Sequence, residues 1–235
     1  MITKKNITKV LFLFLFIHLF LWTLVPTISN VNLPLDTIEA LAWGSNLEWG
    51  FNKHPPFSAF AVNLVYFIFG QNDWAYYFLS QIFVITAFFF VWKFSNEILE
   101  DKILSLISVL ILSSIYFYNF TTPEFNVNVS QIPFWALTVY FFWRGINSNS
   151  KKNWILLGIF SSLGFLSKYL FIYLLISLFT YFIFYIKKNK KYFSNYFFSI
   201  IISLILLAPH FIWLHENDFI TISYALSRSA LTDST

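Results

Sequence analysis

The chain has 235 residues, of which 58% are hydrophobic and only 11% are charged. With 32 Phe, 13 Tyr and 9 Trp beside so few charges, we expect an all-α integral membrane protein, a single membrane domain over residues 1–235 with about seven or eight helices. The net charge of +4 does not indicate nucleic-acid binding, because the lysines stand at segment ends and form no basic face. Since the chain has no cysteine, disulfides, thiolate metal sites and thiol catalysis are excluded.

The first apolar segment, residues 10–25, follows Lys4, Lys5 and Lys9. The positive-inside rule places this amino-terminal end in the cytoplasm. Because no small-residue cleavage site follows, we expect an uncleaved membrane span and not a signal peptide. The polar stretch 27–56 is then expected on the opposite, periplasmic-type face of the inner or plasma membrane.

Residues 36–56 hold three carboxylates, a lysine, a histidine, two tryptophans and two prolines. Pro34 followed by Asp36 is typical of a helix start, and Glu39 and Trp43 would share a helix face with Asp36. We therefore predict a short helix on the membrane surface, near residues 36–47, with its acids toward water. The alternative is a solvated loop whose acids only keep it out of the bilayer.

The later apolar segments are 57–70, 74–92, 103–118, 129–143, 153–186 and 193–207. Segment 57–70 would be roughly 21 Å long as a helix, against about 30 Å of hydrocarbon, so we expect it not to be a simple span. This choice puts Glu124 on the same side as Asp36, although loops 94–102 and 119–128 give no clear side by their own charges.

Two basic clusters, at 144–152 and 187–191, are typical of cytoplasmic loops. Residues 153–186 must then form a helical hairpin that turns near 164–168. Lys168 would lie at the far face, together with 27–56 and 210–235. A lysine at that depth indicates either a functional site or a side chain that snorkels to the interface.

The polar segments favour one kind of chemistry. A glycine-rich phosphate loop, a His-Glu-x-x-His zinc helix and a Gly-x-Ser-x-Gly elbow are all absent from the sequence. Acids near lysine and histidine at a membrane surface suit group transfer from a lipid-linked phosphate. A carboxylate would take the proton of the acceptor, and cations would stabilise the charge on the leaving phosphate.

Six short motifs, spread over nearly the whole chain, resemble those of polyprenyl-phosphate-dependent glycosyltransferases with the GT-C membrane fold. This superfamily includes the protein O-mannosyltransferases and the lipid A aminoarabinose transferase. The motifs are Asp36-x-x-Glu39, Lys53-His54-Pro55-Pro56, Phe69-Gly70, Glu124-Phe-Asn-x-Asn128, Leu166-Ser-Lys168-Tyr169, and Pro209-His-Phe-Ile-Trp213 with Asp218-Phe.

The resemblance implies that Asp36 is catalytic. Glu39 is the second catalytic candidate, because Thr37 stands where the family usually has a glutamate directly after the aspartate and Glu39 is the nearest further acid. It also implies that Lys53, His54 and Lys168 bind the donor phosphate. Whether a divalent metal binds near Lys53 and His54 is left open. No metal ligands are assigned and no cofactor is firmly predicted. Candidate substrate contacts are Glu124, Asn128 and His210, and we expect Asp36, Lys53, His54 and Lys168 to converge on one pocket.

The expected function is that of a membrane glycosyltransferase that uses a polyprenyl-phosphate sugar and a lipid, glycan or protein acceptor. Family members usually run to about twice this length, so the chain resembles their amino-terminal half. A truncated inactive homologue, or an assembly partner of a split enzyme with a separately encoded second half, is therefore the alternative. A transporter or flippase would favour charges inside spans and inverted repeats, and the sequence has neither. The sugar, the acceptor and the oligomeric state are left open.

Overall fold

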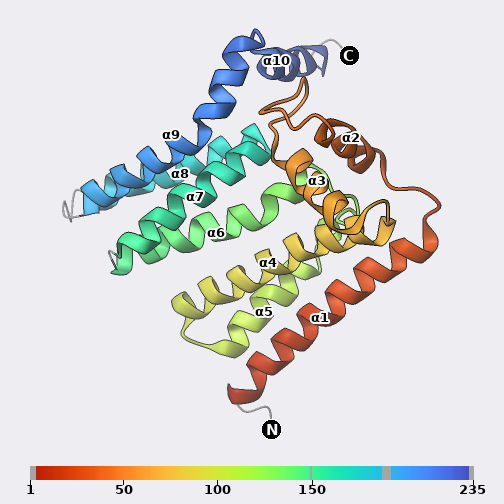
Figure 1. Cartoon of the computed structure of the whole chain (residues 1–235). Coiled ribbons are helices and arrows are strands. Elements are labelled where there is room, and N and C mark those ends of the chain that lie inside the picture. Colours follow the sequence, from red (N-terminus) through yellow and green to blue (C-terminus); the bar gives the residue numbers. More distant parts are fainter. Residues whose placement is uncertain (1–3, 149, 187–191, 233–235) are drawn as a thin grey trace.

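The computed structural model describes residues 4–148, 150–186 and 192–232, and in these ranges it contains helices and no strand. Eight helices form an elongated bundle, as the sequence predicts, while α2 and α10 lie at one end of it (Figure 1). The α-helices are α1 (Lys4–Ser29), α2 (Leu35–Gly44), α3 (Phe57–Phe69), α4 (Asp73–Leu99), α5 (Lys102–Ser113), α6 (Val127–Ser148), α7 (Lys151–Ser167), α8 (Ile172–Ile186), α9 (Phe193–Glu216) and α10 (Ile220–Thr232). Two 3-10 turns, η1 (Tyr116–Tyr118) and η2 (Tyr169–Phe171), complete the described elements.

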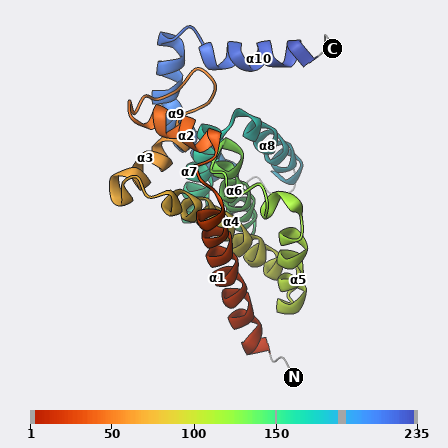
Figure 2. The ribbon, with the colours of Figure 1, turned by 90° about the vertical axis from the view of Figure 1, so that its right-hand side faces the viewer.

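Three helices in the described part of the chain are long and apolar enough to cross a membrane: Asn6–Ser29 within α1, α4 and α9. The surface helix expected near 36–47 is α2. Helix α3 has 13 residues, which makes it about 20 Å long and shorter than the hydrocarbon layer. It lies at the end of the bundle beside α2 (Figure 2), in agreement with the expectation that segment 57–70 is not a simple span.

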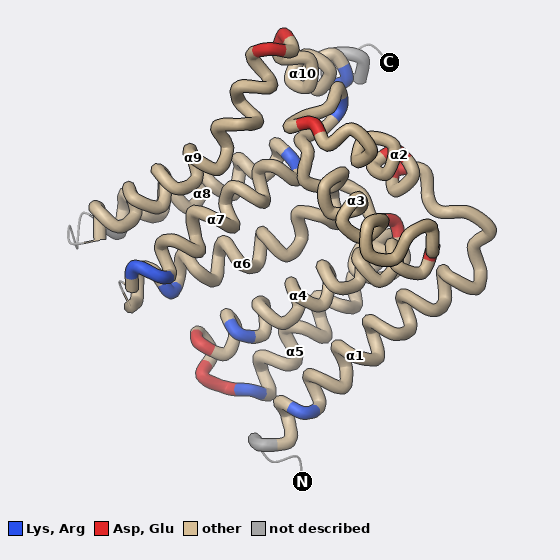
Figure 3. Tube along the Cα trace, viewed as in Figure 1, with Lys and Arg blue, Asp and Glu red and all other residues tan. Residues whose placement is uncertain are grey.

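The links between helices gather at two ends of the bundle (Figure 3). One end holds the start of α1 and the α4–α5 and α6–α7 links, where Arg144 Nη1 donates to Glu97 Oε1 at 3.0 Å. The opposite end, called the loop end here, holds α2 with the stretches on either side of it, residues 114–126, the link between α7 and η2, and α10. Residues 100–102 and 119–126, whose sides the charges of the sequence left open, thus lie at opposite ends of the bundle. The predicted basic cluster 187–191 lies outside the described residues.

Buried polar contacts hold the loop end together. The Ser80 hydroxyl of α4 donates to the carbonyl of Thr122. Asn126 caps α6, because its Oδ1 accepts from the backbone N–H groups of Asn128 at 2.9 Å and Val129 at 3.1 Å. These bonds fix where α6 begins, and therefore which side chains its first turn offers.

The segment between α2 and α3 is held by α9, far along the chain. Trp213 Nε1 donates to Glu48 Oε2 at 3.1 Å. A Cβ built on Gly50 would lie only 2.3 Å from the Trp213 ring, so glycine is required for this close approach. Docking against α9 gives the segment a fixed shape up to His54, whose carbonyl accepts from Phe51 N–H at 3.1 Å.

Candidate active site

Helix α2 presents two acids on one face, as its sequence spacing predicts. It begins after Pro34, with Asp36 in its first turn and Glu39 one turn later. Both acids line one small pocket with His54 and Asn126. The pocket measures about 10 Å³, room for about one water molecule, so these groups lie close together and a larger ligand must bind beside them.

Asp36 is held by residues from the loop before α6. Its backbone N–H donates to Glu124 Oε1 at 3.1 Å, and Asn126 Nδ2 donates to Asp36 Oδ2 at 3.3 Å. Next to it, the Thr37 hydroxyl donates to the Phe125 carbonyl at 3.1 Å. Burial raises the pKa of Glu124, and the neighbouring Asp36 carboxylate raises it further. Two acids that are far apart in sequence therefore form one pair at the loop end.

Lys53 and His54 bring cationic groups to the same place. The Lys53 ammonium forms an ion pair with Glu39, and this hydrogen bond is the main reason that the pKa of Lys53 is raised. The His54 ring stands edge-on to Trp43, with 5.9 Å between ring centroids. Burial lowers the pKa of His54, and the Lys168 ammonium lowers it further. The charge on Lys168 is thus close enough to act on His54.

Lys168 follows the last residue of α7 in an extended conformation, and its ammonium donates to Asn128 Oδ1. Burial lowers the pKa of Lys168. Asn128 lies in the first turn of α6, two residues after the Asn126 that contacts Asp36. The start of α6 therefore links Asp36 to Lys168. Lys53 and Lys168 do not line the small pocket that holds Asp36 and His54, but each is bonded to a neighbour of it, Lys53 to Glu39 and Lys168 to Asn128. The convergence of the four residues on one pocket, and their catalytic and binding roles, stay predictions.

His210 is fully buried and joins three segments. Its Nδ1 lies 2.6 Å from the Trp49 carbonyl oxygen, and its Nε2 lies 2.8 Å from the Tyr169 hydroxyl. A carbonyl can only accept, so Nδ1 bears the hydrogen and Nε2 accepts from Tyr169. Both nitrogens thus bond within the chain, next to the segments that hold His54 and Lys168. A direct substrate contact by His210 stays a prediction.

The sequence interpretation missed Asn126 and Tyr169, both of which hold predicted site residues in place. For Asn126 a signal existed, because an asparagine directly before an apolar run is a common helix cap. Tyr169 stands in the motif that contains Lys168, but its partner could not be read from the motif, since His210 lies in another helix. In the described ranges, no group of three or more His, Asp or Glu side chains is arranged to hold a metal ion.

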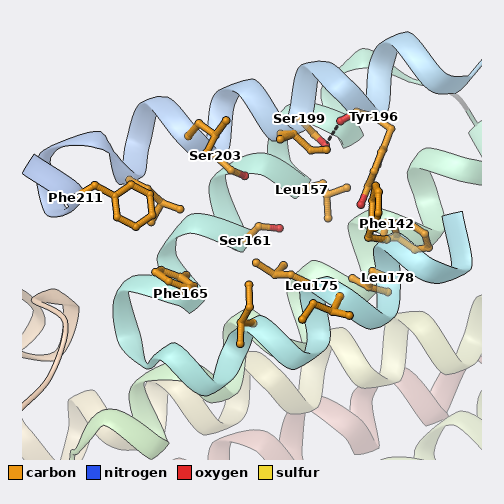
Figure 4. Close-up of a pocket in the computed structure, with 16 residues that line it drawn as sticks. Phe142, Leu157, Ser161, Phe165, Leu175, Leu178, Tyr196, Ser199, Ser203 and Phe211 are labelled. Carbon is orange, nitrogen blue, oxygen red and sulfur yellow. Dashed lines mark hydrogen bonds between the residues drawn. The ribbon is translucent and has the colours of Figure 1, made fainter. Parts of the chain in front are cut away.

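An apolar pocket of about 390 Å³ lies between α7, α8 and α9 (Figure 4). It extends along α9 from Tyr196 to Phe211, a rise of about 22 Å. Among its few polar groups, the Ser199 hydroxyl donates to the Tyr196 carbonyl at 2.6 Å and so is satisfied within its own helix. Phe165 and Ile172 line the pocket and flank Lys168 in sequence. The pocket is therefore an elongated apolar space that reaches the neighbourhood of a cation.

A family model described as dolichyl-phosphate-mannose-protein mannosyltransferase matches residues 53–213. The chain is also 34% identical, over 127 residues, to the undecaprenyl phosphate-alpha-4-amino-4-deoxy-L-arabinose arabinosyl transferase of Wigglesworthia glossinidia brevipalpis. The aligned part is 52% of this chain and 22% of that protein, so the chain spans about a fifth of this relative. No solved structure matches. The family match includes Lys53, His54 and Lys168 and begins after Asp36 and Glu39.

Proposed function

Because the chain belongs to the dolichyl-phosphate-mannose-protein mannosyltransferase family, we propose that it acts as a membrane glycosyltransferase. The donor is a sugar linked to a polyprenyl phosphate, and the acceptor is a lipid, glycan or protein at the non-cytoplasmic face of the cell membrane. The relative's name, which specifies an undecaprenyl phosphate donor, supports this choice of donor. The chain acts alone or together with a separately encoded second half.

The observation that favours this function is the link from Asp36 through Asn126 and Asn128 to Lys168. Through two asparagines of the same helix start, it connects a carboxylate with an ammonium, which supports a shared site for the two. Asp36 takes the proton of the acceptor hydroxyl or amine, whose oxygen or nitrogen forms a bond to the anomeric carbon of the sugar. The bond from that carbon to the phosphate oxygen breaks, and the leaving phosphate keeps the electron pair. Lys168 stabilises its negative charge.

The apolar pocket of Figure 4 accommodates the first isoprene units of the donor. Its lining is almost entirely apolar, its long axis follows α9, and it reaches the residues beside Lys168. A polyprenyl phosphate has the same division, with a long apolar chain and one anionic group at its end. In this arrangement the tail lies between helices while the phosphate meets the ammonium.

The test is sugar transfer in proteoliposomes that contain the purified chain and a radiolabelled polyprenyl-phosphate sugar. A second preparation adds the product of the neighbouring reading frame. We expect labelled acceptor and free polyprenyl phosphate in at least one preparation. Donor binding without transfer in both would indicate the inactive homologue, and movement of the donor across the bilayer without transfer would indicate a flippase.

A further inference from the structure

A larger cavity, of about 670 Å³, also reaches the start of α6, from the side of α1. The end of α1 forms one wall, and the segment from Phe117 to Val129 forms the other. Asn126 lines this cavity and also the small pocket that contains Asp36. A ligand in the cavity would therefore be one side chain, that of Asn126, away from the Asp36 carboxylate. The volume falls within the range of about 300–1,000 Å³ that is usual for small-molecule sites.

The charge of the cavity differs from that of the Lys168 region. Glu124 is the one charged side chain among the described residues that line it, and these include no lysine, arginine or histidine. The Lys168 ammonium does not line the cavity and is held by Asn128 Oδ1, so the charge that a ligand in the cavity meets first is the Glu124 carboxylate, which repels anionic groups and suits a neutral ligand. The phosphate of the donor is instead expected at Lys168.

The remaining lining residues fit the chemistry of a carbohydrate. Three asparagines and two hydroxyl residues provide polar groups for sugar hydroxyls, although Asn126 also bonds Asp36 and the start of α6, and Asn128 Oδ1 accepts from Lys168. Three aromatic rings provide flat apolar surfaces for the C–H faces of a sugar ring. These lining residues are Asn30, Asn126 and Asn128, Ser29 and Thr121, and Trp22, Phe117 and Phe120. The rings of Trp22 and Phe120 meet edge to face at 5.2 Å, and Phe120 is 64% exposed.

We propose that this cavity binds the neutral saccharide head of a membrane-anchored acceptor, an assignment that rests on the proposed glycosyltransferase function. Trp22 belongs to the candidate span Asn6–Ser29, whereas Glu124 and Asn126 belong to the loop end. The cavity thus extends from apolar to polar surroundings. A lipid-anchored sugar has the same two parts, an apolar anchor and a polar head. Asp36 does not line the cavity, but Asn126, which lines it, donates to Asp36 Oδ2, so an acceptor hydroxyl reaches the proposed base when it takes the place of the Asn126 amide.

Two photoreactive probes with the same alkyl chain test this, one with a neutral disaccharide head and one with a phosphate head. The chain is reconstituted in phospholipid nanodiscs, labelled, and analysed by mass spectrometry of its peptides. We expect the disaccharide probe to label residues 22–30 and 117–129, and the phosphate probe to label peptides near Lys168. Phe120→Ser should weaken disaccharide labelling about three- to tenfold, which corresponds to the loss of one aromatic contact. Phe67→Ser is the matched control, because Phe67 is 86% exposed and lies on α3, away from the cavity.

The outcomes separate this inference from the proposed function. If only the phosphate probe labels the chain, the saccharide site is overturned and the donor site is retained. If only the disaccharide probe labels it, at 22–30 and 117–129, the cavity is retained and the donor site fails. Equal labelling in the Phe120→Ser and wild-type chains overturns the saccharide site. Protection of the cavity by a serine-containing peptide, but not by free disaccharide, also overturns it and indicates a protein acceptor.

Discussion

The two lysines expected to hold the donor phosphate lie in different surroundings. Lys53, in the segment after α2, forms an ion pair with Glu39, whereas Lys168, after α7, donates to the neutral amide of Asn128. The pKa of Lys53 is raised mainly by its acidic partner, and the pKa of Lys168 is lowered by burial. The family motif includes both lysines, yet their partners differ in charge.

This difference separates two uses of a cation. The Lys53 charge is already balanced by Glu39, so we expect Lys53 to add less to phosphate binding than an ammonium without an acidic partner. The Lys168 charge has an amide partner, and a half-buried cation of this kind gains more than a paired one when an anion binds to it. The comparison therefore predicts that the phosphate gains more from Lys168 than from Lys53, and the roles of Lys53 and Glu39 in the site stay predictions.

Asp36→Asn is expected to have the largest effect on transfer. Loss of a positioned general base typically lowers the rate by about 10²–10⁴-fold. The asparagine amide is nearly isosteric with the carboxylate, and the hydrogen bond from the backbone N–H of residue 36 to Glu124 is kept. Sugar transfer and donor binding should be measured in parallel, with binding nearly unchanged. Asp73→Asn, the same change in the first turn of α4, is the control and should leave both unchanged. Full transfer by the Asp36→Asn chain would contradict the assignment.

Lys168→Met is expected to weaken donor binding by about 10- to 100-fold, the value of one or two charged hydrogen bonds. Lys53→Met should weaken it by about threefold or less, because the ammonium that it removes is paired with Glu39. Titration with a fluorescent polyprenyl phosphate gives both dissociation constants. Equal losses in the two variants would refute the distinction between the two lysines.

His210→Phe is expected to lower stability, with a smaller effect on binding than Lys168→Met. It leaves the Trp49 carbonyl and the Tyr169 hydroxyl without their present partner, at a cost of about 1–3 kcal/mol each if they stay buried. The melting temperature in detergent should fall by several degrees, and the donor dissociation constant should rise as η2 and Lys168 shift. His215→Phe changes an exposed histidine of the same helix and serves as the control. An unchanged melting temperature would mean that the hydrogen bonds of His210 to Trp49 and Tyr169 do not stabilise this part of the fold.

The smallest expected effect is the pH dependence of stability caused by His54. Its pKa lies below the usual 6.5, so the unfolded chain binds a proton in a pH range where the folded chain does not. Stability should therefore fall as the pH drops from above 6.5 through the lower folded-state pKa. Melting temperatures at pH 7.5 and pH 5 should show a smaller difference for His54→Asn than for wild type. A larger difference in the variant would mean that the sign is wrong.

The sequence by itself determined the class of fold and the outline of the bundle. The apolar segments are long, the charges stand between them, and in a membrane the backbone must satisfy its own hydrogen bonds, which leaves helices as the natural solution for such segments. The shared face of Asp36 and Glu39 also followed from sequence, because helical spacing within ten residues is a local property. The positive-inside rule also predicted a turn near Lys168, and the structure has one there, between α7 and α8.

Only the tertiary structure decided which of these residues meet. Asp36 contacts Glu124 and Asn126 across about ninety positions of sequence, and His210 reaches Trp49 across a greater separation. Such contacts depend on how whole helices pack, and a single sequence records neither their relative positions nor which partner a lysine selects. For this reason the motifs did not predict that Lys53 pairs with Glu39 and Lys168 with Asn128. A motif specifies residue types, whereas the charge that a ligand meets is set by neighbours that folding brings from distant helices.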